Sequence, residues 1–231
     1  MSNELILILN LVFTYAMVLL AYRFFGKTGL YCWTVMATVA ANIEVLIVVN
    51  AFGLEQTLGN ILFASTFLVT DILSETQGKK AASKAVKIGV FTSLIFVLIS
   101  QSWLHYSPAA TDWASPAIEA IFANTPRLII SSLAVYAIVQ TFDVALYHAI
   151  WKLTTKLCGD KQRFLWLRNN VATLTAQLLN AFLYNFAAFG GMYDLDTLIS
   201  ISVASFAIFI VTSLADTPAV YVARKMKVKE S

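Results

Sequence analysis

Apolar residues form long runs along the chain, and short segments rich in polar or charged residues separate them. The runs cover approximately residues 4–23, 30–52, 58–74, 85–104, 128–151, 171–190 and 198–221. A helix that crosses the hydrocarbon core of a bilayer needs about 20 mostly apolar residues, and these runs are far too long for the strands of a membrane barrel. The pattern therefore predicts an all-α integral membrane protein, in which residues 1–231 form one bundle of about six or seven transmembrane helices.

The basic residues alternate with these runs in a way that predicts the orientation of the helices. Fifteen of the 16 Lys and Arg residues lie in four clusters: Arg23 and Lys27; Lys79, Lys80, Lys84 and Lys87; Lys152, Lys156, Lys161, Arg163 and Arg168; and Arg224, Lys225, Lys227 and Lys229. The segments near residues 53–57, 105–126 and 192–197 contain acidic residues and no Lys or Arg. Because cytoplasmic loops concentrate Lys and Arg, we expect an odd number of spans, an N-terminus outside and a cytoplasmic C-terminus.

The composition agrees with a protein whose main surroundings are the lipid bilayer. Hydrophobic residues make up 59% of the chain and charged residues 13%, whereas a soluble domain has about 25% charged residues. The net charge of +3 comes from the predicted cytoplasmic loops, so it does not indicate a nucleic-acid partner. No basic residue precedes the first run, and we expect a retained helix there rather than a cleaved signal peptide. These features predict a multi-pass protein of the plasma membrane.

Several polar side chains fall inside the apolar runs, where lipid would not solvate them. They are Glu44 in the second run, Thr70 and Asp71 in the third, Gln140 and Asp143 in the fifth, Gln177 and Asn180 in the sixth, and Asp216 in the seventh. A charged residue at the bilayer centre costs about 2.5–3.5 kcal/mol on insertion scales. These side chains should therefore face the interior of the bundle or a wet cavity, although a structural polar network between helices would also explain them.

The end of the third run carries a compact polar motif. Asp71, Ser74, Glu75 and Gly78 are spaced i, i+3, i+4 and i+7, so they share one face of a helix. Two carboxylates about one turn apart can accept several N–H donors together, or they can pair with a basic group such as Arg168 or Lys79. A solvated helix end would explain Glu75, but it does not explain a carboxylate as deep in the run as Asp71.

The same segment, Phe67–Gly78, reads FLVTDILSETQG and resembles the T-D-x-x-x-E-x-x-G signature of the queuosine precursor transporter family, a group of small polytopic membrane proteins. Supporting similarities are Ala41–Asn42–Ile43, Arg127 with Ser131 and Asp143, and Leu167–Arg168–Asn169–Asn170 followed by Gln177. The chain departs from the family pattern at Asn180, where many relatives have Asp, at Gln77, where an aromatic residue is usual, and at Glu44, where a basic or apolar residue is usual.

The resemblance implies an importer of queuosine precursors for salvage of queuosine in transfer RNA. These precursors are 7-deazaguanine bases, such as the cyano or aminomethyl form, or queuine. Such a base presents N1–H and an exocyclic amine side by side, and one carboxylate can accept both, while amides can read its carbonyl and ring nitrogens. The expected substrate-binding residues are Asn42, Glu44, Thr70, Asp71, Glu75, Arg127, Gln140, Asp143, Arg168, Gln177 and Asn180. The two arginines could instead balance carboxylates or lie at helix ends with their charges at the membrane surface.

Other functional classes agree less well with the residues. The chain lacks a G-x-x-x-x-G-K-[ST] phosphate loop, which leaves proton coupling, facilitated diffusion with intracellular trapping, or a separate energising module. It also lacks H-E-x-x-H, G-x-S-x-G and any Cys/His cluster, so we predict no enzyme, no cofactor and no metal, and an intramembrane enzyme is a remote alternative. The nearer alternative is a transporter of another small solute such as a vitamin, acting alone, as a homodimer or as the binding subunit of an ATP-driven importer.

Overall fold

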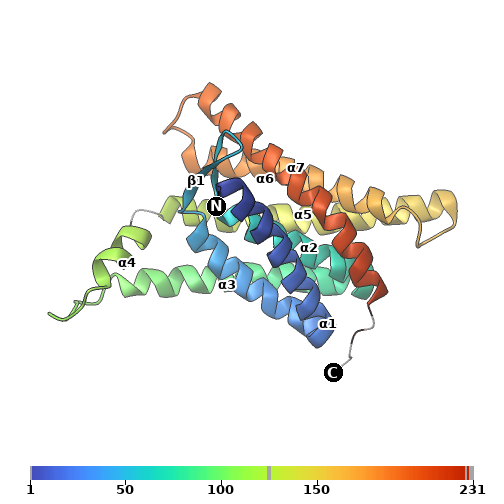
Figure 1. Ribbon diagram of the computed structural model, residues 1–231, viewed down its shortest axis with the longest axis horizontal. Helices are drawn as coiled ribbons and strands as arrows, with labels where there is room; N and C mark the ends of the chain where they lie inside the picture. Colours follow the sequence, from blue (N-terminus) through green and yellow to red (C-terminus); the bar gives the residue numbers. More distant parts are fainter. Residues whose placement is uncertain (1, 124–125, 227, 229–231) are drawn as a thin grey trace.

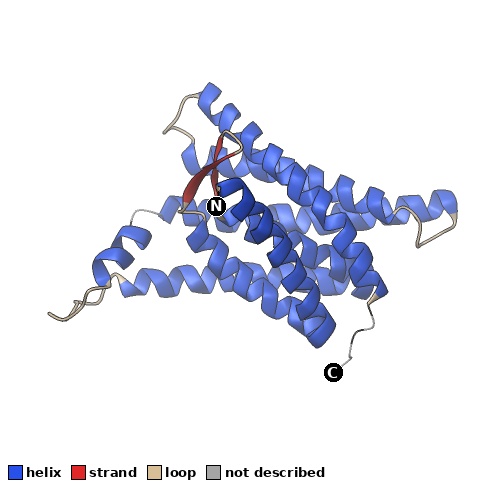
Figure 2. Ribbon diagram, in the orientation of Figure 1, coloured by secondary structure: helices blue, strands red, loops and turns tan. Residues whose placement is uncertain are grey.

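The computed structural model describes residues 2–123, 126–226 and 228, and for residues 54–56, 126, 128 and 129 it describes the backbone alone. Within this part, the chain is helical apart from one short two-stranded hairpin (Figure 2). The all-α class predicted from the apolar runs is therefore confirmed. Two residues of the predicted C-terminal basic cluster, Lys227 and Lys229, lie outside the described residues.

The first helix, α1 (Asn3–Glu44), contains the first apolar run and most of the second, and it reverses direction at Gly26. Gly26 has φ 57° and ψ −143°, a backbone conformation that glycine adopts far more readily than other residues. The start of α1 meets the segment that follows its end, since Asn3 Nδ2 donates to the carbonyl oxygen of Asn50 at 2.9 Å. The two halves of α1 therefore run in opposite directions (Figure 1).

The helix in the second apolar run ends earlier than predicted. Helix α1 ends at Glu44, and strands β1 (Val48–Ala51) and β2 (Leu54–Thr57) follow it as an antiparallel hairpin. Phe52 and Gly53 join the strands with φ of 55° and 73°, as a tight two-residue hairpin turn requires. The prediction that the helix continues beyond Glu44 was wrong, because a run of β-branched residues before a glycine turn favours a hairpin. Glu44 is thus half-buried at a helix end and not near the middle of a span.

Six further helices follow the hairpin. They are α2 (Gly59–Gln77), α3 (Lys79–Trp103), α4 (Ser115–Phe122), α5 (Pro126–Cys158), α6 (Leu165–Phe189) and α7 (Leu195–Lys225). Helices α3, α5, α6 and α7 each begin before the apolar run that predicted them, because hydropathy marks the apolar part of a helix and not its polar ends. Helix α4, with Pro116 in its first turn, lies where the sequence predicted only a connecting segment.

Helices α2 and α6 differ from the others in burial and polarity. Among the described residues, four helices are long and apolar enough to cross a membrane, namely α1, α3, α5 from Ile130 onward, and α7. Every residue from Ala64 to Ser74 in α2 is buried, and α6 buries polar side chains that include Arg168 and Gln177. Helix α2 packs against α1, α3, α5 and α7, while α6 packs against α5 and α7. Helix α2 therefore lies inside the bundle, where other helices cover it, and α6 buries its polar side chains while residues such as Trp166 and Leu178 stay exposed.

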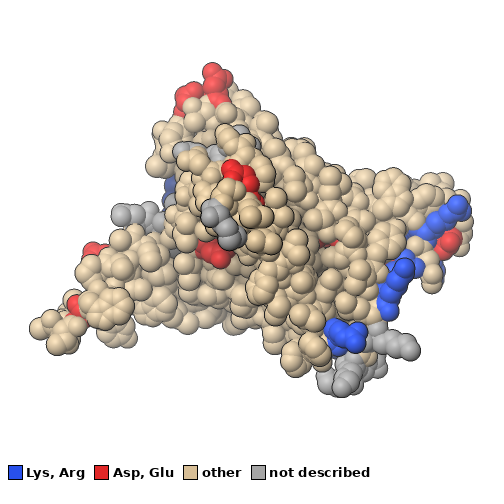
Figure 3. Space-filling view, viewed as in Figure 1, with Lys and Arg blue, Asp and Glu red and all other residues tan. Residues whose placement is uncertain are grey.

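The two ends of the bundle carry opposite charges, as Figure 3 shows. We call one end the basic end; it contains the reversal at Gly26, the junction at Gly78, the α5–α6 connection (residues 159–164) and the end of α7 (Figure 1). The opposite, acidic end contains the hairpin, the α3–α4 connection (residues 104–114) and the α6–α7 connection (residues 190–194). The alternation of basic and acidic segments in the sequence therefore corresponds to the two ends of one bundle.

Gly78 alone joins α2 to α3, and its backbone explains why the polar motif ends in glycine. Its φ of 83° and ψ of 174° lie in a region that is essentially restricted to glycine. The chain can therefore reverse within one residue at the basic end. This reversal keeps Asp71 and Glu75, on the last turns of α2, packed against the neighbouring helices.

Candidate functional site

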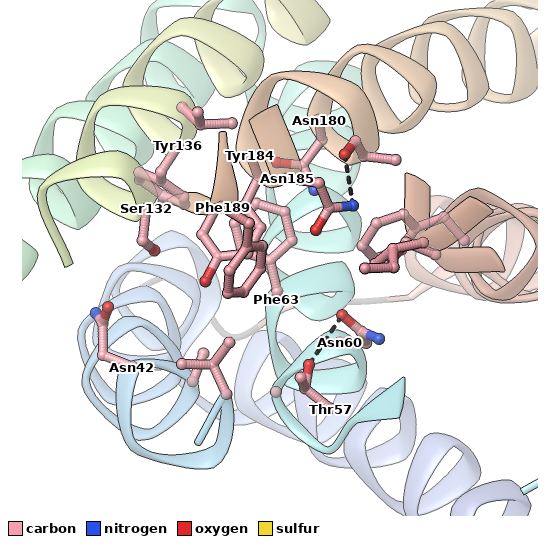
Figure 4. A pocket seen from close by; sticks show the side chains of 18 of the residues that line it. Asn42, Thr57, Asn60, Phe63, Ser132, Tyr136, Asn180, Tyr184, Asn185 and Phe189 are labelled. Atoms are coloured by element: carbon pink, nitrogen blue, oxygen red, sulfur yellow. Dashed lines mark hydrogen bonds between the residues drawn. The ribbon is translucent and has the colours of Figure 1, made fainter. Parts of the chain in front are cut away.

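A cavity of about 590 Å³ lies toward the acidic end, between α1, α2, α5, α6 and α7 (Figure 4). Amide and aromatic side chains line it together with hydroxyl and small aliphatic ones; the amides and aromatics are Asn42, Asn60, Asn180 and Asn185, with Phe63, Tyr136, Tyr184, Phe189, Tyr193 and Phe209. Among the described residues, no Asp, Glu, Lys, Arg or His side chain lines it. Its volume is within the range of about 300–1,000 Å³ typical of small-molecule sites. The lining therefore suits a small, flat, uncharged polar molecule.

The aromatic rings of the cavity lie between amides on its two sides. In Figure 4, the rings of Phe63, Tyr184 and Phe189 lie between Asn42 of α1 and Asn180 of α6. The ring centroids of Tyr184 and Phe189 are 6.2 Å apart at an interplanar angle of 83°. Asn42 Nδ2 donates to a carbonyl oxygen of its own helix at 2.7 Å, which holds the side chain in place. An aromatic face can stack on a flat ligand while the amides bind its edges.

A buried hydrogen-bond network lies beneath the cavity, on the side of the basic end. Gln140 of α5 donates through Nε2 to Thr66 Oγ1 at 2.7 Å and accepts from Thr70 Oγ1 at 3.3 Å. All three side chains are buried, and Thr66 also lines the cavity. We call these three residues the floor, because they join α2 to α5 directly below the cavity.

Three buried carboxyl groups lie beyond the floor. Asp71 of α2, Asp143 of α5 and Asp216 of α7 are at most 1% exposed, and they are close enough for their charges to interact. We call them the aspartate cluster. Asp71 Oδ2 accepts a hydrogen bond from Thr173 Oγ1 of α6 at 2.9 Å. In the described part of the chain, neither oxygen of Asp143 has a hydrogen-bond partner.

An ion pair closes the bundle at the basic end. Arg168 Nη2 lies 2.6 Å from Glu75 Oε2 and 2.8 Å from Oε1, and the Arg168 and Glu75 side chains are 0% and 3% exposed. Tyr147 of α5 donates its hydroxyl to Glu75 Oε2 at 2.9 Å, and Arg224 Nη1 of α7 lies 3.4 Å from Glu75 Oε1. We call these four residues the Glu75 clamp. It joins α2, α5, α6 and α7 through one carboxylate, and of the two basic partners expected from the sequence, Arg168 rather than Lys79 pairs with Glu75.

Comparisons with known proteins place the chain in a family. The model of the family described as "putative vitamin uptake transporter" matches residues 57–223, which include all of α2, α3, α5 and α6. The chain belongs to this family of transporters. A relative from Bacillus subtilis (strain 168), described as "probable queuosine precursor transporter", is 37% identical over 226 residues, which cover 98% of this chain and 96% of the relative. No solved structure matches the chain.

The family membership agrees with the resemblance seen at Phe67–Gly78 and with a multi-pass protein of the plasma membrane. The matched residues include the floor, the aspartate cluster and nearly the whole Glu75 clamp, of which Arg224 follows directly after the match. The alignment with the Bacillus subtilis relative covers 98% of this chain, so it extends over the α1 residues of the cavity that lie outside the family match.

The transporter distributes its predicted site residues over several layers rather than in one pocket. Asn42 and Asn180 line the cavity; Thr70 and Gln140 belong to the floor; Asp71 and Asp143 belong to the aspartate cluster, with Gln177 buried on α6; and Glu75 and Arg168 form the clamp. Glu44 and Arg127 lie outside these layers. Arg127 donates to the carbonyl oxygens of Ala187 and Gly190 at 3.0 and 2.5 Å, so it caps the end of α6.

Sequence reasoning missed several residues of the transporter's layers. Asn60 and Phe63 line the cavity at a spacing of three from Thr66, and this helical periodicity in α2 was a signal that could have revealed them. Arg224 was interpreted only as a residue that sets topology, since nothing in the sequence connects it to Glu75. The sequence gives a weak indication that Thr173 faces the interior, because it lies one helical turn before Gln177.

Proposed function

We propose that this protein imports queuosine precursors, the 7-deazaguanine bases, across the plasma membrane for queuosine salvage in transfer RNA. The observation that carries the proposal is the uncharged cavity lined by asparagines and aromatic rings. A deazaguanine is flat and offers donors and acceptors along its edge, which asparagine side chains can match with both their donor and acceptor atoms. The relative that is 37% identical and described as a queuosine precursor transporter supports the same substrate class.

In this proposal, the base first binds in the cavity. It meets the floor, the aspartate cluster and the Glu75 clamp only later, as it moves toward the cytoplasm. Asn42 and Asn180 bind the edges of the base, and Tyr184 stacks on its face, which contributes about 1–3 kcal/mol. Gln140 and Thr70 of the floor lie on the path from the cavity toward the basic end. These two residues contact the base only after it leaves the cavity.

The proposed topology has seven passes, counting α1 as two, with the N-terminus outside and the C-terminus in the cytoplasm. The gathering of Lys and Arg at one end of the bundle supports it, because cytoplasmic segments concentrate these residues (Figure 3). The cavity then opens toward the outside, and the Glu75 clamp closes the cytoplasmic side. We assign no catalytic step to any residue.

The proposal is tested by restoring queuosine in transfer RNA. The host is a bacterium that cannot make queuosine and lacks its own importer, supplied with nanomolar cyano-deazaguanine, aminomethyl-deazaguanine or queuine. Wild type should restore the modification with at least one base. Asn180→Ala and Tyr184→Leu should raise the required base concentration by roughly 5- to 150-fold, because each removes a contact worth about 1–3 kcal/mol.

A matched control is Asn50→Ala, which makes the same chemical change on an exposed strand residue outside the cavity lining. It should behave as wild type when membrane levels are equal. Failure of wild type with all three bases, despite normal membrane insertion, would contradict the substrate class.

A vitamin or another small solute is the second candidate, and the description of the matching family favours it. Uptake of labelled cyano-deazaguanine in the presence of excess unlabelled compounds separates the two. Competition by deazaguanines but not by a panel of vitamins supports the first function, and the reverse pattern supports the second.

A further inference from the structure

We propose that the aspartate cluster is a proton-binding site that couples import of the substrate to entry of protons. The inference rests on the proposed function, and it names the ion that accompanies the base. Asp71, Asp143 and Asp216 come from three helices that enclose the pathway, between the floor and the Glu75 clamp. The cluster therefore lies where neither side of the membrane has direct access in this arrangement.

The balance of buried charge requires protons at the cluster. Three neighbouring carboxylates would carry three negative charges in the interior of a membrane protein. The buried guanidinium of Arg168 is already bound bidentately to Glu75, which Arg224 also approaches. Burying unpaired charge is far more costly than burying a neutral carboxylic acid, so the cluster stays buried only with most of its members protonated.

The hydrogen-bond network provides independent support. Within the described residues, five buried oxygens around the cluster can only accept and have no partner: Asp71 Oδ1, Asp143 Oδ1 and Oδ2, Asp216 Oδ1 and Gln177 Oε1. The hydroxyls of Ser74 and Ser213, each one turn from an aspartate on its own helix, are also buried without a partner. Gln177 is 1% exposed and lies one turn from Thr173, which binds Asp71, so it faces the cluster. The acceptor oxygens without partners therefore outnumber these two free donors. A proton on a carboxyl group converts an acceptor into a donor and supplies what is missing.

The titratable groups next to the cluster are Tyr15 of α1, Glu75 of α2 and Tyr147 of α5. The positive charges lie one step further away, since Arg168 interacts with Tyr147, and His148 with Lys79 and Arg168. The Tyr15 hydroxyl lies next to Asp216 and donates to the carbonyl oxygen of Thr212 at 3.1 Å, and Tyr147 donates to Glu75. In the part of the chain that the structure describes, no three acidic or His/Cys side chains converge as metal ligands would.

The position of the aspartate cluster between the floor and the Glu75 clamp explains how its protonation would affect transport. The cluster can take protons from the outside when the floor opens toward the cavity, and it can release them when the clamp opens toward the cytoplasm. The loaded transporter reorients only with the cluster protonated, because the bound base excludes water from it. After the base and the protons leave to the cytoplasm, the empty transporter returns with the cluster deprotonated and in contact with water, so each cycle moves the base and the protons inward together.

The test uses the purified full chain in proteoliposomes, which contain no enzyme that traps the base. Two measurements are made with labelled cyano-deazaguanine: exchange at equal pH on both sides, and accumulation under an inward proton gradient with the membrane potential clamped. A gradient of one pH unit should give accumulation of up to about tenfold for one proton per base. A protonophore should abolish this accumulation and leave exchange intact.

Asp143→Asn and Asp216→Asn should lose gradient-driven accumulation and still exchange the base, and retained exchange also shows that they are folded. Asp196→Asn, the same change at an exposed position at the other end of α7, is the control and should accumulate as wild type does. Wild type that exchanges but only equilibrates, accumulates with a sodium gradient instead, or tolerates both substitutions overturns the proton site alone. Absence of exchange in wild type overturns the proposed substrate and the coupling with it.

Discussion

The Glu75 clamp gives a prediction whose size can be worked out from its geometry. Glu75→Gln removes the negative charge that Arg168 contacts at 2.6 and 2.8 Å, while the Arg168 side chain is 0% exposed. The buried guanidinium is then left without its counter-charge, and breaking a buried pair in this way costs about 3–5 kcal/mol. For a chain of this length, 1 kcal/mol shifts Tm by about 2–4 °C, so we expect Tm to fall by roughly 6–20 °C.

The assay is thermal unfolding of the purified protein in detergent, followed by the loss of the monodisperse peak in size-exclusion chromatography. A double-mutant cycle adds Arg168→Met and the combination with Glu75→Gln. The double variant should be more stable than Glu75→Gln alone, because it removes the unpaired charge. Glu119→Gln, the same change on the exposed face of α4, is the control.

Two results would refute this reasoning. The first is a Tm for Glu75→Gln within 2 °C of the control, as about 0–1 kcal/mol for a solvent-exposed pair would give. The second is additivity of the two substitutions, which would mean that the two side chains do not interact despite their contact.

Three other changes test the backbone and the helix ends by the same thermal assay. Gly78→Ala should destabilise by about 1–3 kcal/mol, because φ of 83° with ψ of 174° strains any residue with a Cβ; a normal Tm would show that the junction relaxes. Arg127→Gln should lower Tm by a few degrees, because it removes the hydrogen bond that caps α6 at Gly190. It should leave the substrate concentration for half-maximal uptake unchanged. A large rise in that concentration would instead place Arg127 in substrate binding. Gly29→Ala should reduce folded yield, since its Cβ would lie 2.2 Å from the carbonyl oxygen of Ala21 across the reversal of α1, and wild-type yield would contradict this packing.

Much of the candidate pathway could be predicted before any contact was known. Polar residues inside apolar runs identified Asp71, Asp143 and Gln177 as interior groups, because lipid cannot solvate them, and all three are buried. The spacing of Asp71 and Glu75 gave their common helix face, and the excess of buried carboxylates anticipated a partner such as Arg168.

The layering of these residues could not be predicted, because hydropathy does not say at what height two helices pass each other. Eleven residues were expected in one substrate site, yet only Asn42 and Asn180 of them line the cavity. Arg127 looked like a candidate ligand, but its guanidinium reaches the end of α6, more than fifty residues away in sequence.

The sequence by itself determined the membrane-embedded helical class, the alternation of charge between the two ends and the motif from Thr70 to Gly78, because each follows from local composition, periodicity and one glycine. Only the tertiary structure decided that the chain after Glu44 forms a hairpin, that one carboxylate joins four helices at the basic end, and that Asp143 has no hydrogen-bond partner among the described residues. The physical reason is that solvation depends on single residues, whereas pairing depends on the distance between side chains that packing alone sets.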